Sequence, residues 1–243
     1  MQAIILASGY NTRVNHLCPG LPKALFPVNG RPFLFLYLQT LFKEGIYDVI
    51  IITYYQADKI KAFINNFKTP RGSSVTVVER RQDYGPVGAL CDIEELLEDN
   101  FFLFYVDVLF DINLKKALTE HKKNGLPACA LITQDEFGMF SDRELLIDKK
   151  NHIVTKFKPH SFLKTNGWVD VGQIYNRSIV ESLKKCPPAE EHINLNIWPK
   201  LIAKKRLGYF KVGPVLDIGT EVSYKLTSEI VKKNAKFSVF TSK

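Results

Sequence analysis

Short apolar runs alternate with longer amphipathic runs over the first half of the chain. The short runs are rich in β-branched and aromatic residues and predict strands, whereas the longer runs carry apolar residues at helical spacing and predict helices. One run, residues 101–105, is apolar without alternation, as expected for a strand that helices cover on both faces. The pattern therefore predicts an α/β fold with a mainly parallel sheet. The predicted strands are residues 3–6, 48–53, 75–78 and 101–105, and the predicted helices are residues 32–42, 56–67, 88–97 and 114–123.

The pattern becomes less regular in the second half. Residues 144–148 and 153–157 flank a polar turn, which predicts a hairpin. No repeat, low-complexity stretch or Ser/Gly-rich linker interrupts the chain, so residues 1–243 are expected to form a single domain. The other predicted strands are residues 128–133, 168–175 and 208–212, and the predicted helices are residues 178–185, 195–203 and 221–233.

The composition is that of an ordinary globular protein, with 243 residues, 46% hydrophobic and 24% charged. No apolar run approaches the roughly 18 residues that a membrane span needs, and the N-terminus lacks the features of a signal peptide. We therefore expect no membrane partner and a cytoplasmic location. The cysteines are far apart and show no C-x-x-C spacing, which disfavours a disulfide framework or a zinc site.

The formal net charge of +8 suits an anionic ligand. The positive residues are spread along the chain, and many fall at the ends of predicted helices, where cations meet the carbonyl end of the helix dipole. A nucleic-acid surface would need a basic stripe interleaved with stacking aromatics, and the sequence shows none. We therefore expect a small anionic ligand and no nucleic-acid partner.

The N-terminal segment contains a candidate phosphate clamp. An apolar strand runs into small residues, and an arginine and a lysine follow, in the segments Leu6-Ala7-Ser8-Gly9-Tyr10-Asn11-Thr12-Arg13 and Leu21-Pro22-Lys23. Small residues let a backbone close around an anion, with loop N–H groups pointing into the concavity. Arg13 and Lys23 would reach that anion from two sides. The segment predicts a nucleotide site, although Gly-x-x-x-Arg alone would favour an ordinary strand-to-helix turn.

Two aspartates are candidates for a magnesium site. Asp107 follows a buried strand, and ligands of open α/β sheets gather beyond the carboxyl ends of strands. Asp217 ends a short apolar run, and Thr220 is the better cap of the next helix, which leaves Asp217 without a structural role. Two such carboxylates suit Mg²⁺ when phosphate oxygens and water complete its ligands. Asp111 could be a further ligand, but we favour it as a cap of the helix at residues 114–123.

Three weaker features fit the same kind of site. The segment Gly85 to Gly88 opens a helix, and its glycines allow the backbone to approach a flat ligand or its phosphates. Gln82 precedes this loop and carries an amide that can read a base edge. Lys158 ends a predicted strand and could reach a second phosphate, while a solvated lysine is equally compatible with the pattern.

Together these segments closely resemble the sugar-1-phosphate nucleotidyltransferases. The resemblance begins with Ala7-Ser8-Gly9-x-x-Thr12-Arg13, Pro22-Lys23 and Pro27-Val28-x-Gly30-x-Pro32, and continues in the family's order through the glycine-rich loop, Asp107, Lys158-Pro159 and Asp217-Ile218-Gly219-Thr220. Ordered co-occurrence along the whole chain is more specific than any single motif. The compact length looks most like the subgroup that contains heptose-1-phosphate and mannose-1-phosphate guanylyltransferases.

The resemblance implies a three-layer α/β/α Rossmann-like nucleotidyltransferase fold, with a nucleotide-binding half at about residues 1–125 and an acceptor-binding half at about residues 126–243. It implies a Mg²⁺-dependent enzyme that joins a nucleoside triphosphate to a sugar 1-phosphate and releases pyrophosphate. Arg13 would hold the β- and γ-phosphates, Lys23 the α-phosphate, and Asp107 with Asp217 the metal. The implied nucleotide contacts are Leu6, Ala7, Ser8, Gly9, Tyr10, Asn11, Thr12, Gln82, Gly85 and Gly88, and the implied acceptor contacts are Asp107, Lys158, Asp170 and Gly172.

Several positions depart from the family's pattern. Asn11 stands where glycine is usual, but asparagine tolerates the left-handed backbone better than other non-glycine residues. Val106 replaces the glycine before the metal-binding aspartate, and Pro86-Val87 replaces a pair of smaller residues. We expect these larger side chains to narrow the pocket for base or acceptor. Two further departures lie on the acceptor side: the absence of glutamate before Lys158, and Asp170-Val171-Gly172 in place of an Asn-Gly or Ala-Gly motif.

The sequence leaves hypotheses from three classes of protein. The leading one is an active guanylyltransferase on a heptose or hexose 1-phosphate, with a cytidylyltransferase on a sugar phosphate or a small phosphorylated alcohol or amine as the alternative. The second is a catalytically weak regulatory homologue that binds nucleotide sugars. A glycosyltransferase ranks last, because its usual Asp-x-Asp motif is here Asp107-Val108-Leu109. The base, the acceptor and any assembly into a homo-oligomer are not decided by the sequence.

Overall fold

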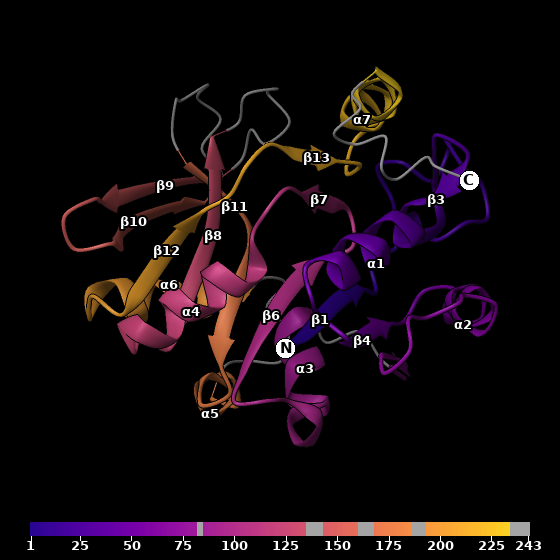
Figure 1. Cartoon of the computed structure of the whole chain (residues 1–243). Coiled ribbons are helices and arrows are strands. Elements are labelled where there is room, and N and C mark those ends of the chain that lie inside the picture. Colours follow the sequence, from indigo (N-terminus) through magenta and orange to yellow (C-terminus); the bar gives the residue numbers. More distant parts are fainter. Residues whose placement is uncertain (82–84, 135–142, 160–167, 186–192, 234–243) are drawn as a thin grey trace.

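A nine-stranded mixed sheet forms the centre of the computed structural model, which describes residues 1–81, 85–134, 143–159, 168–185 and 193–233 (Figure 1). The strands lie in the order β5-β4-β1-β6-β11-β8-β12-β10-β9. Their bounds are β1 (Gln2–Ala7), β4 (Asp48–Thr53), β5 (Ser74–Glu79), β6 (Asn100–Tyr105), β8 (Ala128–Gln134), β9 (Arg143–Asp148), β10 (Ile153–Pro159), β11 (Trp168–Asn176) and β12 (Leu207–Lys211). Two short ribbons accompany the sheet: β2 (Pro27–Val28) with β3 (Arg31–Pro32), and β7 (Val108–Phe110) with β13 (Val215–Asp217).

The sheet is parallel on one side and largely antiparallel on the other. Strands β5, β4, β1 and β6 are mutually parallel, and Ile4 of β1 lies between Ile50 and Leu103. Strand β11 runs antiparallel to both β6 and β8, and β9 pairs with β10 as the predicted hairpin. Parallel neighbours need a long crossover connection, whereas a tight turn produces an antiparallel pair. The helical connections of the first half therefore account for its parallel strands.

Helices cover both faces of the sheet, which confirms the predicted three-layer α/β/α fold. Neighbouring residues of β1 contribute to different hydrophobic clusters, Ile5 to one and Ile4 to the other, because successive side chains of a strand point to opposite faces. The first face carries α1 (Phe33–Lys43), α2 (Ala57–Asn65), α4 (Leu114–Asn124) and α7 (Glu221–Lys233). The second carries α3 (Gly85–Asp92), α5 (Ile179–Leu183) and α6 (Ile193–Ala203).

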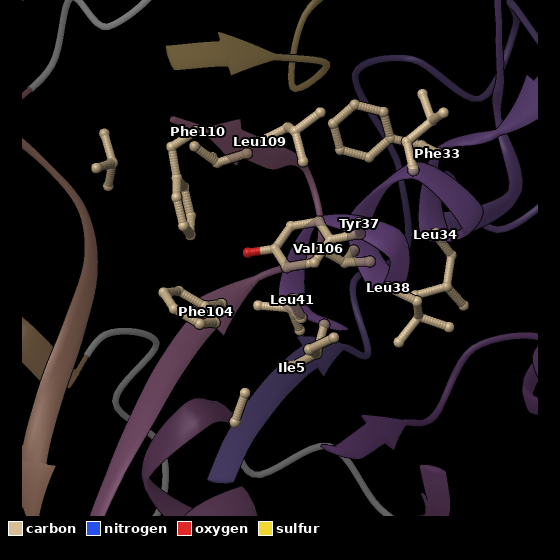
Figure 2. Close-up of a cluster of buried hydrophobic side chains, with 14 of the residues drawn as sticks. Ile5, Phe33, Leu34, Tyr37, Leu38, Leu41, Phe104, Val106, Leu109 and Phe110 are labelled. Carbon is tan, nitrogen blue, oxygen red and sulfur yellow. The ribbon is translucent and has the colours of Figure 1, made fainter. Parts of the chain in front are cut away.

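A dense aromatic cluster supports the carboxyl end of β6 (Figure 2). Tyr37 of α1 packs against Phe104 and Phe110, with ring centroids 6.1 Å apart in both pairs. Burial of the Tyr37 hydroxyl, reinforced by the nearby charge of Asp107, raises its pKa well above the ordinary value. Tyr37 is therefore a neutral core residue that fixes the start of the segment after β6.

Some element boundaries differ from the predicted ones. The helix predicted at residues 88–97 begins at Gly85 and ends at Asp92, and a 3₁₀ turn, Glu94–Leu96, follows it. The ribbon strands β7 and β13 were not predicted, because three residues are too few to establish a period. These two strands matter most for the site, because they bring together residues about a hundred positions apart.

A buried histidine predicts how stability changes with acid. His121 of α4 is 3% exposed, and burial, with a smaller effect of Lys122, lowers its pKa from 6.5 to about 4. A depressed pKa contributes stability that is present above pH 6.5 and lost as the pH falls through 4. We expect this histidine to account for up to about 3 kcal/mol of acid destabilisation. Urea unfolding at pH 7 and pH 4.5 should show a smaller loss for His121→Leu than for the wild type; an equal loss would contradict this assignment.

Among the described residues, no helix is both long enough and apolar enough to cross a bilayer.

Candidate functional site

The loop after β1 contains a residue with a left-handed backbone. Asn11 has φ 58°, which confirms that it adopts the left-handed conformation in the position of a glycine. Its side-chain Nδ2 donates to the carbonyl of Leu21 at 3.3 Å, and its own carbonyl accepts from the backbone N–H groups of Val14 and Asn15. The asparagine therefore ties the loop to the segment that carries Lys23, which a glycine could not do.

The predicted nucleotide contacts in this loop differ in exposure. Leu6 and Ala7 are the buried last residues of β1, so their side chains are not available to a ligand. Gly9 is exposed, and a Cβ added there would meet nothing within 4 Å, which leaves open space above the loop. Ser8 is half-buried and Thr12 is exposed. Tyr10 is 50% exposed and packs against Tyr54 and Tyr55, which follow β4.

The clamp lysine and the first metal candidate form an ion pair. Lys23 lies in a 3₁₀ turn, Lys23–Leu25, and its Nζ is 3.0 Å from Oδ2 of Asp107. Burial by itself would raise the pKa of Asp107, but the Lys23 ammonium and, more weakly, Arg13 outweigh it, so the pKa lies below the ordinary value. Asp107 is therefore ionised at neutral pH, paired with Lys23 and influenced by the charge of Arg13.

The ribbon of β7 and β13 brings Asp217 to the same place. Asp217 pairs with Val108 across the ribbon, and the backbone N–H of Ile218 donates to the carbonyl of Asp107 at 2.9 Å. The Asp217 carboxylate accepts hydrogen bonds at Oδ1 from the Gly219 N–H at 2.8 Å and the Ser223 hydroxyl at 2.6 Å. A Cβ on Gly219 would lie 3.1 Å from that oxygen, a tight contact that glycine avoids.

The electrostatics of the two aspartates suit a cation. Burial of Asp217 and the negative charge of Asp107 raise the pKa of Asp217 to about 6. Two carboxylates that repel each other are the arrangement that a divalent ion relieves, and two protein carboxylates completed by phosphate oxygens and water suit Mg²⁺. No group of three or more His, Cys, Asp or Glu side chains able to hold a metal is found in the described part of the chain. The residues present therefore fit a metal shared with a phosphorylated ligand.

The structure assigns the helix caps near these aspartates. Thr220 Oγ1 accepts from the Ser223 N–H at 3.1 Å, and the Ser223 hydroxyl accepts from the Thr220 N–H at 3.0 Å, which confirms Thr220 as the cap of α7. The prediction that Asp111 caps the following helix is wrong. Asn113 is the N-cap of α4, and its side chain accepts from the Lys116 N–H at 2.8 Å, because it is the residue directly before the helix.

The second glycine-rich loop is braced by a buried arginine. Gly85 has φ 67° at the start of α3, a left-handed conformation that favours glycine. The Arg80 side chain is 2% exposed; its Nε donates to the Asp92 carboxylate at 2.8 Å, and Nη1 donates to the Gly85 carbonyl at 3.1 Å. Arg80 thus joins the end of β5 to both ends of α3. Gln82 lies outside the described residues.

We expect Arg80→Lys to raise the KM for the nucleotide about tenfold with little change in kcat, because lysine cannot bridge Asp92 and Gly85 with a planar fork. Arg81→Lys is the matched control, since Arg81 is the exposed neighbour. Steady-state kinetics with the nucleotide varied provide the measurement. Equal KM values for the two variants would show that the brace has no influence on nucleotide binding.

We predicted that Val106, Pro86 and Val87 narrow the pocket for base or acceptor. This prediction is wrong for Val106 and Val87. Val106 is 7% exposed and packs among the buried side chains around Tyr37 (Figure 2). Val87 is 3% exposed and packs in the cluster on the other face. Val106 is the first residue after β6, where its N–H donates to the carbonyl of Leu6, and Val87 lies in α3; both side chains are directed into the core. Pro86 is half-buried at the start of α3.

The predicted acceptor residues lie on strands of the second half. Lys158 Nζ forms an ion pair with Oε2 of Glu144 at 2.8 Å, across the hairpin of β9 and β10. Asp170 lies on β11 and accepts at Oδ2 from the side-chain amides of Gln173 and Asn194. Gly172 is buried, and a Cβ there would lie 2.8 Å from the Phe104 ring, so packing alone requires a glycine.

The structure therefore brings part of the predicted site together. Hydrogen bonds and charges connect Lys23, Asp107 and Asp217, and Arg13 contributes its charge. Lys158 pairs with Glu144, and Asp170 accepts from Gln173 and Asn194, on the strands and helix of the second half. Glu144 and Arg80 were not predicted, because neither lies in a recognisable motif, and Ser223 was not predicted either. For Ser223 the Thr-x-x-Ser spacing after Asp217 was the available signal.

A three-layer α/β/α fold with a glycine-containing loop after β1, two cations and two converging carboxylates has the features expected of an α/β protein that binds a phosphorylated ligand. The model of the Nucleotidyl transferase family matches residues 2–233. The chain belongs to that family, which confirms the resemblance.

The relatives include mannose-1-phosphate guanylyltransferase 1 of Arabidopsis thaliana, 26% identical over 232 residues that cover 92% of this chain. Mannose-1-phosphate guanyltransferase of Aspergillus fumigatus is 25% identical over 252 residues, covering 97% of this chain and 67% of that protein. The chain spans 63% of the length of the Arabidopsis protein.

Solved structures confirm the fold class. HddC from Yersinia pseudotuberculosis matches with a TM-score of 0.77 and 21% identity, covering 94% of this chain and 98% of that chain. The same protein complexed with GMP-PN matches with a TM-score of 0.76 and 22% identity.

Proposed function

We propose that the protein transfers a nucleotidyl group from a nucleoside triphosphate to a sugar 1-phosphate in the presence of Mg²⁺, and that the nucleotide is GTP and the acceptor a heptose or hexose 1-phosphate. The observation that carries this proposal is the cluster of Lys23, Asp107 and Asp217, which meet where the chain leaves the carboxyl end of β6. The mannose-1-phosphate guanylyltransferases among the relatives support the choice of base and acceptor.

The proposed reaction is an in-line displacement at the α-phosphorus. A phosphate oxygen of the acceptor forms the new bond, the bond from the α-phosphorus to the bridging oxygen breaks, and pyrophosphate leaves. Such a step needs positioning and charge neutralisation more than a covalent nucleophile. Arg13 would neutralise the departing phosphates, and Lys23 would hold the α-phosphate after exchanging its contact with Asp107.

Asp107 and Asp217 would hold the magnesium ion. When bound, the ion neutralises negative charge on the phosphate oxygens. The clamp backbone would orient the triphosphate, with Asn11 keeping the loop in register with Lys23. Lys158 would meet the acceptor phosphate, with Glu144 holding its ammonium in place. Residues up to about 125 would thus bind the nucleotide, and later residues the acceptor, except for Asp217.

The test is a matrix of the four ribonucleoside triphosphates and dTTP against phosphorylated acceptors, with and without Mg²⁺ and with pyrophosphate release measured. The acceptors are mannose 1-phosphate, heptose 1-phosphate, glucose 1-phosphate, phosphocholine and phosphoethanolamine. We expect the highest rate with GTP, a sugar 1-phosphate and Mg²⁺. No release from any pair would refute the proposal, and highest release with CTP and an amine acceptor would reassign the substrate.

A further inference from the structure

Three polar side chains lie buried between β11 and α6. Asp170 is 8% exposed, Gln173 0% and Asn194 1%. Gln173 Nε2 donates to Oδ2 of Asp170 at 2.6 Å, and Asn194 Nδ2 donates to the same oxygen at 2.8 Å. Two amides from different elements therefore hold one carboxylate oxygen in a fixed direction. We refer to Asp170, Gln173 and Asn194 as the polar trio.

Packing does not explain this arrangement. The carbonyl oxygens of Gln173 and Asn194 are buried and accept no hydrogen bond. A buried polar atom without a partner destabilises a fold, and an apolar side chain of similar shape would avoid that loss. The surrounding cluster on this face of the sheet is apolar and includes Ile132 and Ile193. The polar residues of the trio therefore require an explanation other than core stability.

The trio lies toward the catalytic end of the sheet. Strand β11 runs antiparallel to β6, with Gln173 opposite Leu103. Asp170 is therefore displaced from Gln173 toward the carboxyl end of β6, the end from which Asp107 follows. The register shift of β11 between Asp170 and Gly172 adds a bulge at this point. Bulges commonly re-aim a side chain next to an active site.

We propose that Gln173 and Asn194 are positioning residues that hold the Asp170 carboxylate for the hydroxyl groups of a sugar phosphate acceptor. This inference rests on the proposed function and adds to it the two residues that orient the Asp170 carboxylate toward the acceptor. A carboxylate accepts hydrogen bonds only, and a sugar supplies several hydroxyl donors at fixed angles. The two amides restrict the carboxylate to one rotamer, so it recognises one hydroxyl rather than any nearby donor.

The first experiment compares Gln173→Leu and Asn194→Leu with the wild type. Leucine has as many side-chain heavy atoms as asparagine and one fewer than glutamine, and each substitution removes one hydrogen bond to Asp170 and one unpartnered carbonyl oxygen. We expect the KM for mannose 1-phosphate to rise at least about tenfold and the KM for GTP to stay within about twofold. We expect the melting temperature to stay equal or to rise.

Tyr175→Phe is the matched control, because Tyr175 lies on the same strand and its hydroxyl accepts from Trp198 Nε1 of α6 at 3.1 Å. That variant breaks a buried hydrogen bond between the same two elements, farther from Asp107. It should leave both KM values within about twofold of the wild type.

The second experiment uses deoxy analogues of mannose 1-phosphate that each lack one ring hydroxyl. In the wild type, one analogue should lose at least about tenfold in kcat/KM, and in Gln173→Leu the loss for that analogue should largely disappear. An unchanged loss in the variant would overturn the positioning role, as would a fall in melting temperature with no change in the acceptor KM. A preference of the wild type for phosphocholine or phosphoethanolamine would overturn the acceptor class. A wild type inactive with every pair refutes the proposed function itself, and this inference with it.

Discussion

Replacing Asp107 by asparagine is expected to lower kcat at least about a thousandfold at saturating nucleotide and Mg²⁺. The substitution keeps the shape of the side chain but removes the charge that lies 3.0 Å from the Lys23 ammonium. It also removes one of the two carboxylates available to a metal, and the remaining Asp217 cannot hold a divalent ion at comparable strength. The measurement is pyrophosphate release over a range of Mg²⁺ concentrations.

Asp111→Asn is the control for this prediction. Asp111 is an exposed aspartate four positions further on, so it carries the same charge change outside the cluster. Its kcat should stay within about twofold of the wild type. The fold should survive in both variants, which circular dichroism can check. An Asp107→Asn enzyme that keeps a tenth or more of the wild-type kcat would show that Asp107 does not hold the metal.

Replacing Asp217 by asparagine should abolish most activity and yet stabilise the metal-free protein. Asparagine can still accept from the Gly219 N–H and the Ser223 hydroxyl at its Oδ1 atom. It removes the unfavourable burial of a charge and the repulsion from Asp107, which together raise the pKa of Asp217 to about 6. We expect kcat to fall at least about a hundredfold and the free energy of unfolding at pH 8 to rise by up to about 3 kcal/mol.

The pH dependence gives the sign of this effect. The pKa of Asp217 is raised from 3.8 in the unfolded chain to about 6 in the folded protein. A raised pKa means that protonation of Asp217 stabilises the folded protein. This contribution is fully present below pH 3.8 and is lost as the pH rises through 6. Asparagine does not titrate, so the variant should gain most at pH 8 and almost nothing at pH 4. Urea unfolding at both pH values, in chelator, measures the difference.

Two further measurements make this prediction specific. Asp148→Asn should shift stability in the opposite direction, because hydrogen bonds from the Asn151 side chain and backbone lower the pKa of this exposed carboxylate. Mg²⁺ with GTP should stabilise the wild type more than Asp217→Asn, since binding to the folded state alone raises stability. An Asp217→Asn protein less stable than the wild type at pH 8 would contradict the electrostatic account.

Local patterns predicted the parts of the protein whose structure depends on neighbouring residues. The apolar runs became strands because uninterrupted apolar segments suit a doubly covered sheet. Asn11 adopted the left-handed conformation because its side chain tolerates it, and Thr220 capped its helix because its hydroxyl reaches the N–H of Ser223. In each case, interactions among a few residues that are close in sequence are sufficient to determine the local structure.

Other features depend on contacts between distant segments. The structure shows Val106 packing into the core, and only the sheet and α1 together determine that direction. Glu144 meets Lys158 through the register of a hairpin, and Asn194 reaches Asp170 from a helix on another part of the chain. The hydrophobic periodicity of the sequence does not predict these side-chain contacts, because each depends on the register of elements that are distant in the sequence.

The sequence by itself determined the α/β alternation, the clamp and the identity of Arg13, Lys23, Asp107 and Asp217 as candidates. Residue type, spacing and local backbone preference are sufficient for those conclusions. Only the tertiary structure decided that β7 and β13 pair, and this pairing places Asp217 beside Asp107 and raises its pKa. The physical reason is that burial and charge repulsion depend on distances in space, which a chain acquires only after distant segments have packed together.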